Sequence, residues 1–341
     1  MRLSKYVLIA CFVIATLIQS SGYCELNVDW KNLHGRRLSS VAWSPDGTHV
    51  AFVATPTNPD HELDNSPKRA EIWLLPIEKK HPIKATRIAR VKRELEGIPT
   101  SLFWLSNQDL AWSNAAATGF YSTQGFRWYS LSLKDFRLSP LTECSFDLRQ
   151  SRSMDTYAPD DVYYDQKQHN IMFSGHVYGG ERGKASHNLI LLYDLRSRSL
   201  DVIPLQNDMD ETVTMCGSAS YDKPSFFIAA AKKTATSSEV ILWHSTEWSL
   251  KPHCIITRSD ASILFPRLSP DLKRIAWLET ATLFTCDIKT GSRRSIMSIP
   301  ENWDVEDPAL GCPYSWSPKG DEIACIDGPK LRFIQISADT R

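Results

Sequence analysis

The chain has 341 residues, and its 39 Lys and Arg balance 39 Asp and Glu, so its formal net charge is zero. This balance excludes a general nucleic-acid binder, because such a protein needs a basic excess to displace counterions from phosphates. With 42% hydrophobic and 23% charged residues, the composition is neither that of a disordered chain nor that of a polytopic membrane protein.

The amino terminus has the order of a secretory signal peptide. Two cations precede an apolar run, Tyr6–Ile18, and small residues follow it up to Gly22. The run is too short to span a bilayer comfortably, so residues 1–22 are predicted to be removed on export. Cleavage after Cys24, a lipid anchor at Cys24 and an uncleaved anchor are the alternatives. The mature protein is therefore expected to be periplasmic or secreted, without a stable transmembrane segment.

Seven of the eight cysteines follow the signal peptide, and no two of them have the spacing of a zinc or thioredoxin-like motif. Export permits disulfides, but the wide spacing of these cysteines favours small thiols buried within strands. No metal and no cofactor is predicted.

A short signature recurs along the chain, at Val41–Gly47, Pro266–Asp271 and Tyr314–Gly320. Each copy contains Ser-Pro and is followed by a short apolar segment. The proline presets φ at the first central position of a type I turn, and Gly47 accepts the positive φ that closes a bulged hairpin. Each signature therefore predicts a strand, a tight turn and a second strand.

The strand after this turn occurs six times, with central residues at Ala51, Ala111, Met172, Ile228, Ala276 and Ala324. Large apolar residues flank each centre, so both faces of the strand are expected to be buried between neighbouring sheets. A third strand follows in every repeat and a fourth strand in the first five. Four-stranded repeats with centres 48 to 61 residues apart are typical of β-propeller blades.

The repeats predict an all-β fold, a six-bladed β-propeller with four-stranded antiparallel blades, as a single domain over residues 23–341. The sixth repeat ends after its third strand. A closing strand within about residues 25–35, centred on Glu25–Trp30, is expected to complete it, because an open ring exposes two sheet edges. Two stacked β-sandwiches are the alternative.

The Trp43–Gly47 signature, its echoes at Leu268–Asp271 and Trp316–Gly320, and the export signal resemble the TolB-type family of six-bladed propellers with WD40-like repeats. The same repeat is similar to the non-catalytic propeller of prolyl oligopeptidases and dipeptidyl peptidases. The resemblance implies a propeller fold and a tendency to dock other proteins.

The connections between second and third strands are longest in the first three repeats. In a propeller such loops project from one face beside the central channel, so they predict an asymmetric rim. The rim carries aromatic and charged residues of the kinds that anchor protein interfaces. The candidate binding residues are His61, Glu62, Asp64, Tyr121, His176, Tyr178, Arg182 and His187, with Trp303 from the connection into the sixth repeat. The alternative is that these loops are tolerated insertions without a role.

Other motifs give little support to a catalytic, nucleotide-binding or metal-binding site. The sequence has neither a serine-hydrolase elbow nor a zinc-protease motif, and Gly179–Lys184 departs from a P-loop at both ends. His176 and His187 are placed to bind a metal from two ends of one loop, but no carboxylate pattern accompanies them. The basic run Lys79–Arg93 fits a charged outer edge strand, with attraction of an anionic polymer as the alternative.

The leading hypothesis is an exported propeller that binds a protein partner of the cell envelope, or another ligand, through the rim, without catalytic residues. The alternative is an exported hydrolase or lyase that acts on carbohydrate or peptide with carboxylates at the channel mouth. A purely structural role in an envelope complex is a third hypothesis.

Overall fold

A computed structural model describes residues 28–56, 70–77, 83–90, 98–115, 127–143, 159–165, 170–177, 187–197, 200–204, 212–222, 225–233, 236–246, 249–299 and 311–336. These residues form strands and one short 3-10 helix, η1, at Lys31–Leu33. Within these ranges, no helix has the length and hydrophobicity needed to cross a membrane. The signal-peptide prediction for residues 1–22 lies outside the described ranges.

The strands form successive sheets along the chain. The first sheet contains β2 (Arg36–Trp43), β3 (His49–Pro56), β4 (Glu71–Pro76) and β6 (Thr86–Arg90). The second contains β7 (Ile98–Trp104), β8 (Asp109–Ala115), β9 (Arg127–Ser132) and β10 (Leu138–Glu143). The third contains β11 (Pro159–Asp165), β12 (Asn170–Val177), β13 (His187–Asp194) and β14 (Leu200–Pro204).

The fourth sheet contains β15 (Thr212–Asp222), β16 (Ser225–Lys233), β17 (Ser238–Thr246) and β18 (Ser249–Ser259). The fifth contains β19 (Ile263–Leu268), β20 (Arg274–Glu279), β21 (Thr282–Asp287) and β22 (Arg293–Ser298). The sixth has three described strands, β23 (Tyr314–Trp316), β24 (Glu322–Asp327) and β25 (Lys330–Gln335).

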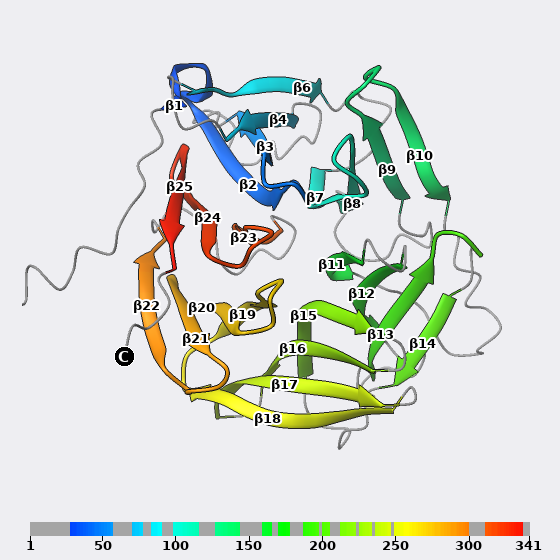
Figure 1. Ribbon diagram of the computed structural model, residues 1–341, viewed down its shortest axis with the longest axis vertical. Coiled ribbons are helices and arrows are strands. Elements are labelled where there is room, and N and C mark those ends of the chain that lie inside the picture. Colours follow the sequence, from blue (N-terminus) through cyan, green and yellow to red (C-terminus); the bar gives the residue numbers. More distant parts are fainter. Residues whose placement is uncertain are drawn as a thin grey trace, which may run out of the picture.

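The sheets stand around a common axis, with the first strand of each sheet innermost (Figure 1). Every pairing within these sheets is antiparallel, and the strands follow one another in chain order. The all-β prediction with four-stranded antiparallel sheets is confirmed. The predicted second, third and fourth strands also occur at the expected places, because alternating apolar residues and Ser-Pro turns specify them locally.

The predicted closing strand is wrong for the residues that can be checked. Val28–Asp29 form β1, which pairs in parallel with β5 at Ile83–Lys84 and not with β25. The following tryptophan explains this path, because Trp30 packs against Phe52 of the first sheet with their ring centroids 6.4 Å apart. Residues 25–27 of the predicted strand lie outside the described ranges.

The first and sixth sheets contact each other directly through their innermost strands. The backbone N–H of Val41 donates to the carbonyl oxygen of Cys312 (3.2 Å), and the N–H of Trp43 donates to Oγ of Ser315 (3.2 Å). Along the rest of the chain, β2 contacts β7, β7 contacts β11, β11 contacts β15 and β15 contacts β19. These contacts hold neighbouring sheets face to face.

The core lies between the sheets. The small centres of the second strands, among them Ala51, Ala276 and Ala324, are completely buried. Large side chains flank them, such as Trp112 and Trp277, which are also buried. An alanine at the centre lets two sheets approach closely while the flanking rings fill the space on both faces.

Three of the four cysteines whose side chains the structure describes, Cys286, Cys312 and Cys325, are buried free thiols, as predicted. Cys254 is free as well but exposed. Burial raises the pKa of the Cys286 and Cys325 thiols above their ordinary value. Both buried groups therefore stay protonated at neutral pH and act as small apolar side chains.

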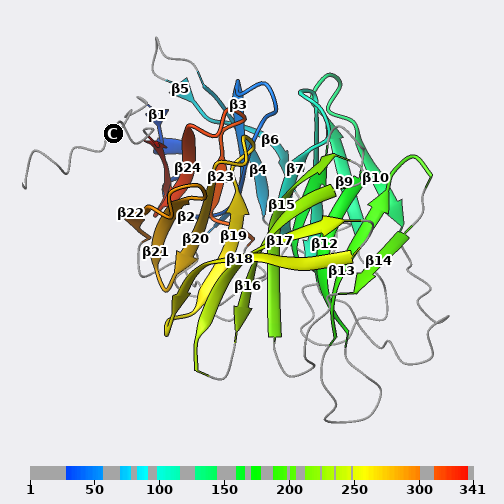
Figure 2. The same cartoon turned by 60° about the horizontal axis from the view of Figure 1, so that its bottom comes forward.

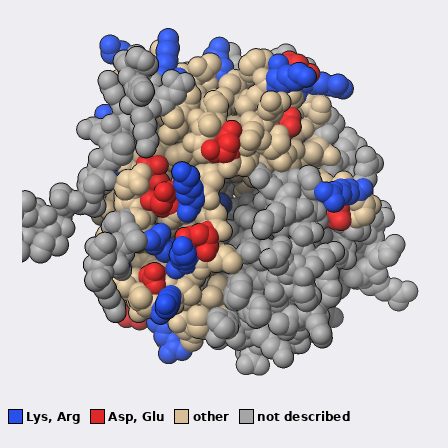
Figure 3. Space-filling model, in the orientation of Figure 1, with Lys and Arg blue, Asp and Glu red and all other residues tan. Residues whose placement is uncertain are grey.

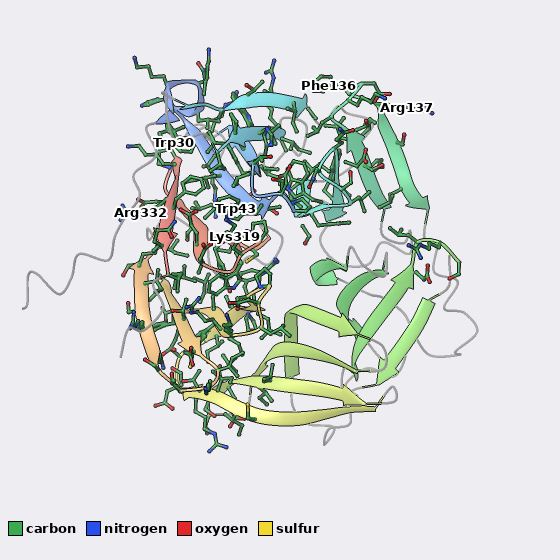
Figure 4. All side chains as sticks on the ribbon, viewed as in Figure 1. Trp30, Trp43, Phe136, Arg137, Lys319 and Arg332 are labelled. Carbon is green, nitrogen blue, oxygen red and sulfur yellow. The ribbon has the colours of Figure 1, made fainter. Side chains whose placement is uncertain are left out.

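The signature turns form as the sequence predicts. Gly47 has φ +72° and its N–H donates to the carbonyl oxygen of Ser44 (2.9 Å). The turns of the first, fifth and sixth sheets lie side by side near the axis, where Figure 4 shows Lys319. A Cβ on Gly320 would lie 3.0 Å from Oδ1 of Asp271, and Nη1 of Arg274 donates to the carbonyl oxygen of Gly320 (3.0 Å). We call this side of the molecule the turn end.

Candidate functional site

The opposite side carries the connections between second and third strands, and we call it the loop end. These connections span residues 57–70, 116–126 and 178–186 in the first three sheets, but only 280–281 and 328–329 in the last two. The predicted asymmetry is therefore present in the strand boundaries. Because both strands bordering each connection are well-defined β-strands, the loop end has a fixed base.

Most of the predicted site residues lie outside the described ranges, namely His61, Glu62, Asp64, Tyr121, Tyr178, Arg182 and Trp303. His176 lies in β12 and His187 in β13, on paired strands. Their Cα atoms are one position out of register, since His176 is opposite Asn188 and His187 is opposite Val177. The backbone thus brings two of the predicted residues to the base of one loop, and a binding role stays a prediction for all nine.

A buried ion cluster supports the base of the first long connection. Glu71, the first residue of β4, has a side chain only 3% exposed. One of its carboxylate oxygens lies 2.7 Å from Nη1 of Arg36, and the other accepts a hydrogen bond from Nη1 of Arg87 (2.9 Å). The indole nitrogen of Trp73 donates to the same carboxylate (3.2 Å). Two guanidinium groups and an indole therefore compensate the desolvation of this charge.

Glutamates also form ion pairs at the loop end of the fourth and fifth sheets. Glu239 of β17 pairs with Nε of Arg258 at 2.5 Å. Glu279, the last residue of β20, pairs with Nη2 of Arg293 at 2.5 Å and accepts a hydrogen bond from Oγ of Ser259 (2.7 Å). The Arg293 guanidinium also lies 4.0 Å from the ring centre of Phe284. Each of these glutamates is therefore held by an arginine at the base of a loop.

One arginine of the loop end differs from the others. Arg37 follows Arg36 on β2 and so projects from the other face of the strand, on the side away from Glu71. Its Nε and Nη2 are buried and have no hydrogen-bond partner in the part of the chain that the structure describes. Oγ of Ser39, two residues further and 2% exposed, has no partner there either. Buried donors of this kind are costly unless an acceptor reaches them.

The sequence interpretation missed Arg36, Arg37, Ser39 and Glu71. The available signal was a pair of adjacent arginines at the start of an innermost strand. Adjacent residues of a strand face opposite sides, so one of two neighbouring arginines must serve a different partner from the other. Glu71 gave no signal, because its partners come from three separate strands.

The titratable groups with shifted pKa values lie elsewhere. The backbone N–H of Ser197 donates to Asp194 and that of Thr290 donates to Asp287, and these bonds hold both carboxyl pKa values below their ordinary range. Both aspartates are the last residues of third strands, β13 and β21, and so lie at the turn end. Within the described ranges, no three His, Cys, Asp or Glu side chains are grouped in a way that would hold a metal ion.

The comparisons with known proteins concern the fold. No protein-family model matches the chain, and no curated protein sequence matches it. Among solved structures, the chain is similar to an α-L-arabinanase of Penicillium chrysogenum in complex with arabinobiose. The TM-score is 0.54 and the identity 10%, over 88% of this chain and 94% of the arabinanase.

A structure described in a study of two prolyl endopeptidases matches with a TM-score of 0.43 and 12% identity, over 75% of this chain and 34% of that one. The arabinanase likeness covers almost the whole of both chains and, at its low identity, shows the fold alone. Together with sheets arranged around an axis, it shows that the chain folds as a β-propeller.

Proposed function

We propose that this protein is an exported, TolB-like six-bladed propeller that binds an acidic segment of a protein partner at its loop end. The observation that carries the proposal is the pair of buried donors at Arg37 and Ser39, which have no acceptor in the described part of the chain. Because these donors are buried, a carboxylate of a partner would have to insert below the surface, where it would accept hydrogen bonds from the guanidinium in the geometry that arginine favours.

The architecture supports the assignment of this end. The clusters around Glu71, Glu239 and Glu279 make the base of the loop end rigid, which lowers the entropy cost of binding. The strands that border the long connections of the first three sheets end at this base, and the sequence of these connections contains the predicted residues His61, Tyr121, Tyr178 and Arg182. Exposed aromatic residues and arginines of this kind commonly anchor partners.

A ring of six blades is part of the proposal. We propose that the ring closes through contact between β2 and β23, without a shared sheet. The hydrogen bonds from Val41 to Cys312 and from Trp43 to Ser315 support this closure. The proposed location, in the periplasm or outside the cell, rests on the signal-like sequence of residues 1–22.

The alternative is an exported enzyme that hydrolyses or cleaves a carbohydrate or peptide. The known substrate class of the similar arabinanase makes arabinan oligosaccharides the first carbohydrates to test. In the described ranges, the loop-end glutamates Glu71, Glu239 and Glu279 all form ion pairs with arginine, which suits a supporting role better than proton transfer.

The test is quantitative affinity capture from envelope extract, with residues 23–341 immobilised. The variants are Arg37→Met, Ser39→Ala and a replacement of residues 178–186 by a short glycine linker, and Lys319→Ala at the turn end is the control. We expect a partner that wild type and the control retain and that the three variants lose. Equal capture by all five proteins would contradict the proposal. Release of reducing sugar from arabinan oligosaccharides would instead support the enzyme.

A further inference from the structure

The hairpin between β9 and β10 exposes apolar side chains. Phe136 is 61% exposed and Leu138 is 43% exposed, and both lie at or beside the tip. Figure 4 places Phe136 and Arg137 at the outer edge of the molecule, at the end of this hairpin. Ile255 of β18 is the other large hydrophobic residue with comparable exposure in the described ranges. We call Lys134–Leu138 the hairpin tip.

The backbone of the hairpin tip is strained at the exposed aromatic residue. Phe136 has φ +53°, a left-handed conformation that is unfavourable for a residue with a bulky Cβ substituent. The fifth sheet shows what the turn requires. In the hairpin between β9 and β10, the N–H of Ser132 donates to the carbonyl oxygen of Arg137 (3.0 Å). In the corresponding hairpin of the fifth sheet, the N–H of Asp287 donates to the carbonyl oxygen of Ser292 (3.0 Å).

This equivalence places Gly291, with φ +69°, at the position of Phe136. Glycine adopts such a conformation without steric cost. The phenylalanine ring cannot offset its strain by burial, because most of it is exposed to solvent. A strained residue that the fold does not need is a sign of function.

The charges beside the ring indicate the kind of surface that it meets. Lys134 and Arg137 are exposed on either side of Phe136. The carboxylate of Asp135 accepts a hydrogen bond from the backbone N–H of Arg137 (3.2 Å), and the tip keeps a net positive charge. An aromatic residue between cations is typical of the headgroup region of a membrane, where the ring enters the interface and the cations meet lipid phosphates.

The position of the tip is compatible with a bilayer. It is a connection between third and fourth strands and therefore lies at the turn end, and Figure 2 shows it on the same side as β1 and β5. A convex tip enters a bilayer without a preformed pocket, whereas a protein partner would have to provide one.

We propose that the hairpin tip is a membrane-contact site for anionic lipid. Phe136 and Leu138 enter the interface, and Lys134 and Arg137 contact lipid phosphates. The turn end then faces the membrane and the loop end faces away from it. This inference does not depend on the proposed partner at the loop end.

Sedimentation with vesicles at millimolar lipid tests the proposal. Residues 23–341 are used, because they contain every described strand and lack the apolar run. We expect binding to vesicles that contain phosphatidylglycerol and much weaker binding to pure phosphatidylcholine. Phe136→Gly is expected to reduce the affinity at least about tenfold, as loss of a buried aromatic side chain predicts. Lys134→Gln and Arg137→Gln are each expected to reduce it about fivefold.

Thermal unfolding separates this function from a structural role. Phe136→Gly relieves the backbone strain, so its midpoint is expected to equal or exceed that of wild type while vesicle binding is lost. Ile255→Ser is the matched control, since it removes an exposed apolar side chain from another sheet and should leave vesicle binding unchanged. Absence of wild-type binding, or full binding by Phe136→Gly, would overturn the proposal, as would a lowered midpoint for that variant.

Discussion

The indole nitrogen of Trp104 donates a hydrogen bond to the carbonyl oxygen of Ala42 on the neighbouring sheet (3.1 Å). Trp316 makes the same bond to Arg267 between the fifth and sixth sheets (3.2 Å). Trp43 occupies the corresponding position of the first sheet, but its Nε1 is buried without a hydrogen-bond partner among the described residues. Its ring instead packs edge-on against the ring of Phe333, with the two ring centroids 5.7 Å apart. A tryptophan at the end of the first strand therefore fixes its sheet to the preceding one at Trp104 and Trp316, but not through such a bond at Trp43.

Replacement of these tryptophans by phenylalanine should separate the hydrogen bond from the ring. Trp104→Phe and Trp316→Phe leave a buried carbonyl oxygen without its donor, and each should lower the free energy of unfolding by about 1–3 kcal/mol. Trp43→Phe removes a donor that has no partner and should cost clearly less. Urea titration of the three variants measures the difference. Equal losses at all three positions would show that ring volume, and not the indole bond, matters.

Replacement of the two adjacent arginines of β2 by methionine should change the free energy of unfolding in opposite directions. Arg36→Met leaves Glu71 buried with one guanidinium fewer and should lower the free energy of unfolding by about 3 kcal/mol. Arg37→Met removes buried donors without a partner and should raise it by about 1 kcal/mol. Chemical denaturation of both variants is the measurement. Destabilisation by Arg37→Met as large as that by Arg36→Met would show that Arg37 serves the fold.

Local features of the sequence predicted the sheets well. The Ser-Pro turns around Gly47 and Gly320 are specified by residues close in the sequence, and the strand centred on Ala51 follows directly from its continuous apolar run. The path of Val28–Asp29 was predicted wrongly, because the choice between β5 and β25 depends on contacts such as that of Trp30 with Phe52. Propensity carries no information on which of two distant edges a short strand will join.

The candidate site shows the same division. Loop lengths could be predicted from the repeat, and the strand boundaries agree with them. The cluster around Glu71 could not be predicted, because Arg36, Trp73 and Arg87 come from three different strands of the first sheet. Ion pairs between distant strands leave no periodic pattern in a single sequence.

Alanine substitutions at two glycines should distinguish backbone strain from crowding. Gly291 and Gly320 have nearly the same φ, +69° and +70°, so an alanine carries a similar conformational cost of about 1 kcal/mol at either position. A Cβ at Gly291 meets no described atom within 4 Å, whereas one at Gly320 lies 3.0 Å from Asp271 and 3.3 Å from Ser269. Gly320→Ala should therefore be the more destabilising change in thermal unfolding. The reverse order would mean that the turns of the fifth and sixth sheets are not in contact.

The acid stability of the fold should depend on Asp287. Hydrogen bonds from the backbone N–H and then the hydroxyl of Thr290 hold the pKa of this carboxyl below 3.8, the value for the unfolded chain. A carboxylate with a lowered folded-state pKa contributes stability that is complete above pH 3.8 and is lost as the pH falls through its folded-state pKa. Asp287→Asn should therefore be less stable than wild type at neutral pH, and the difference should shrink in acid. Thr290→Val keeps the backbone donor and should show a smaller effect of the same sign.

Urea midpoints measured for the three proteins from neutral pH down into acid would reveal this convergence. Parallel curves would show that this turn does not contribute to acid sensitivity.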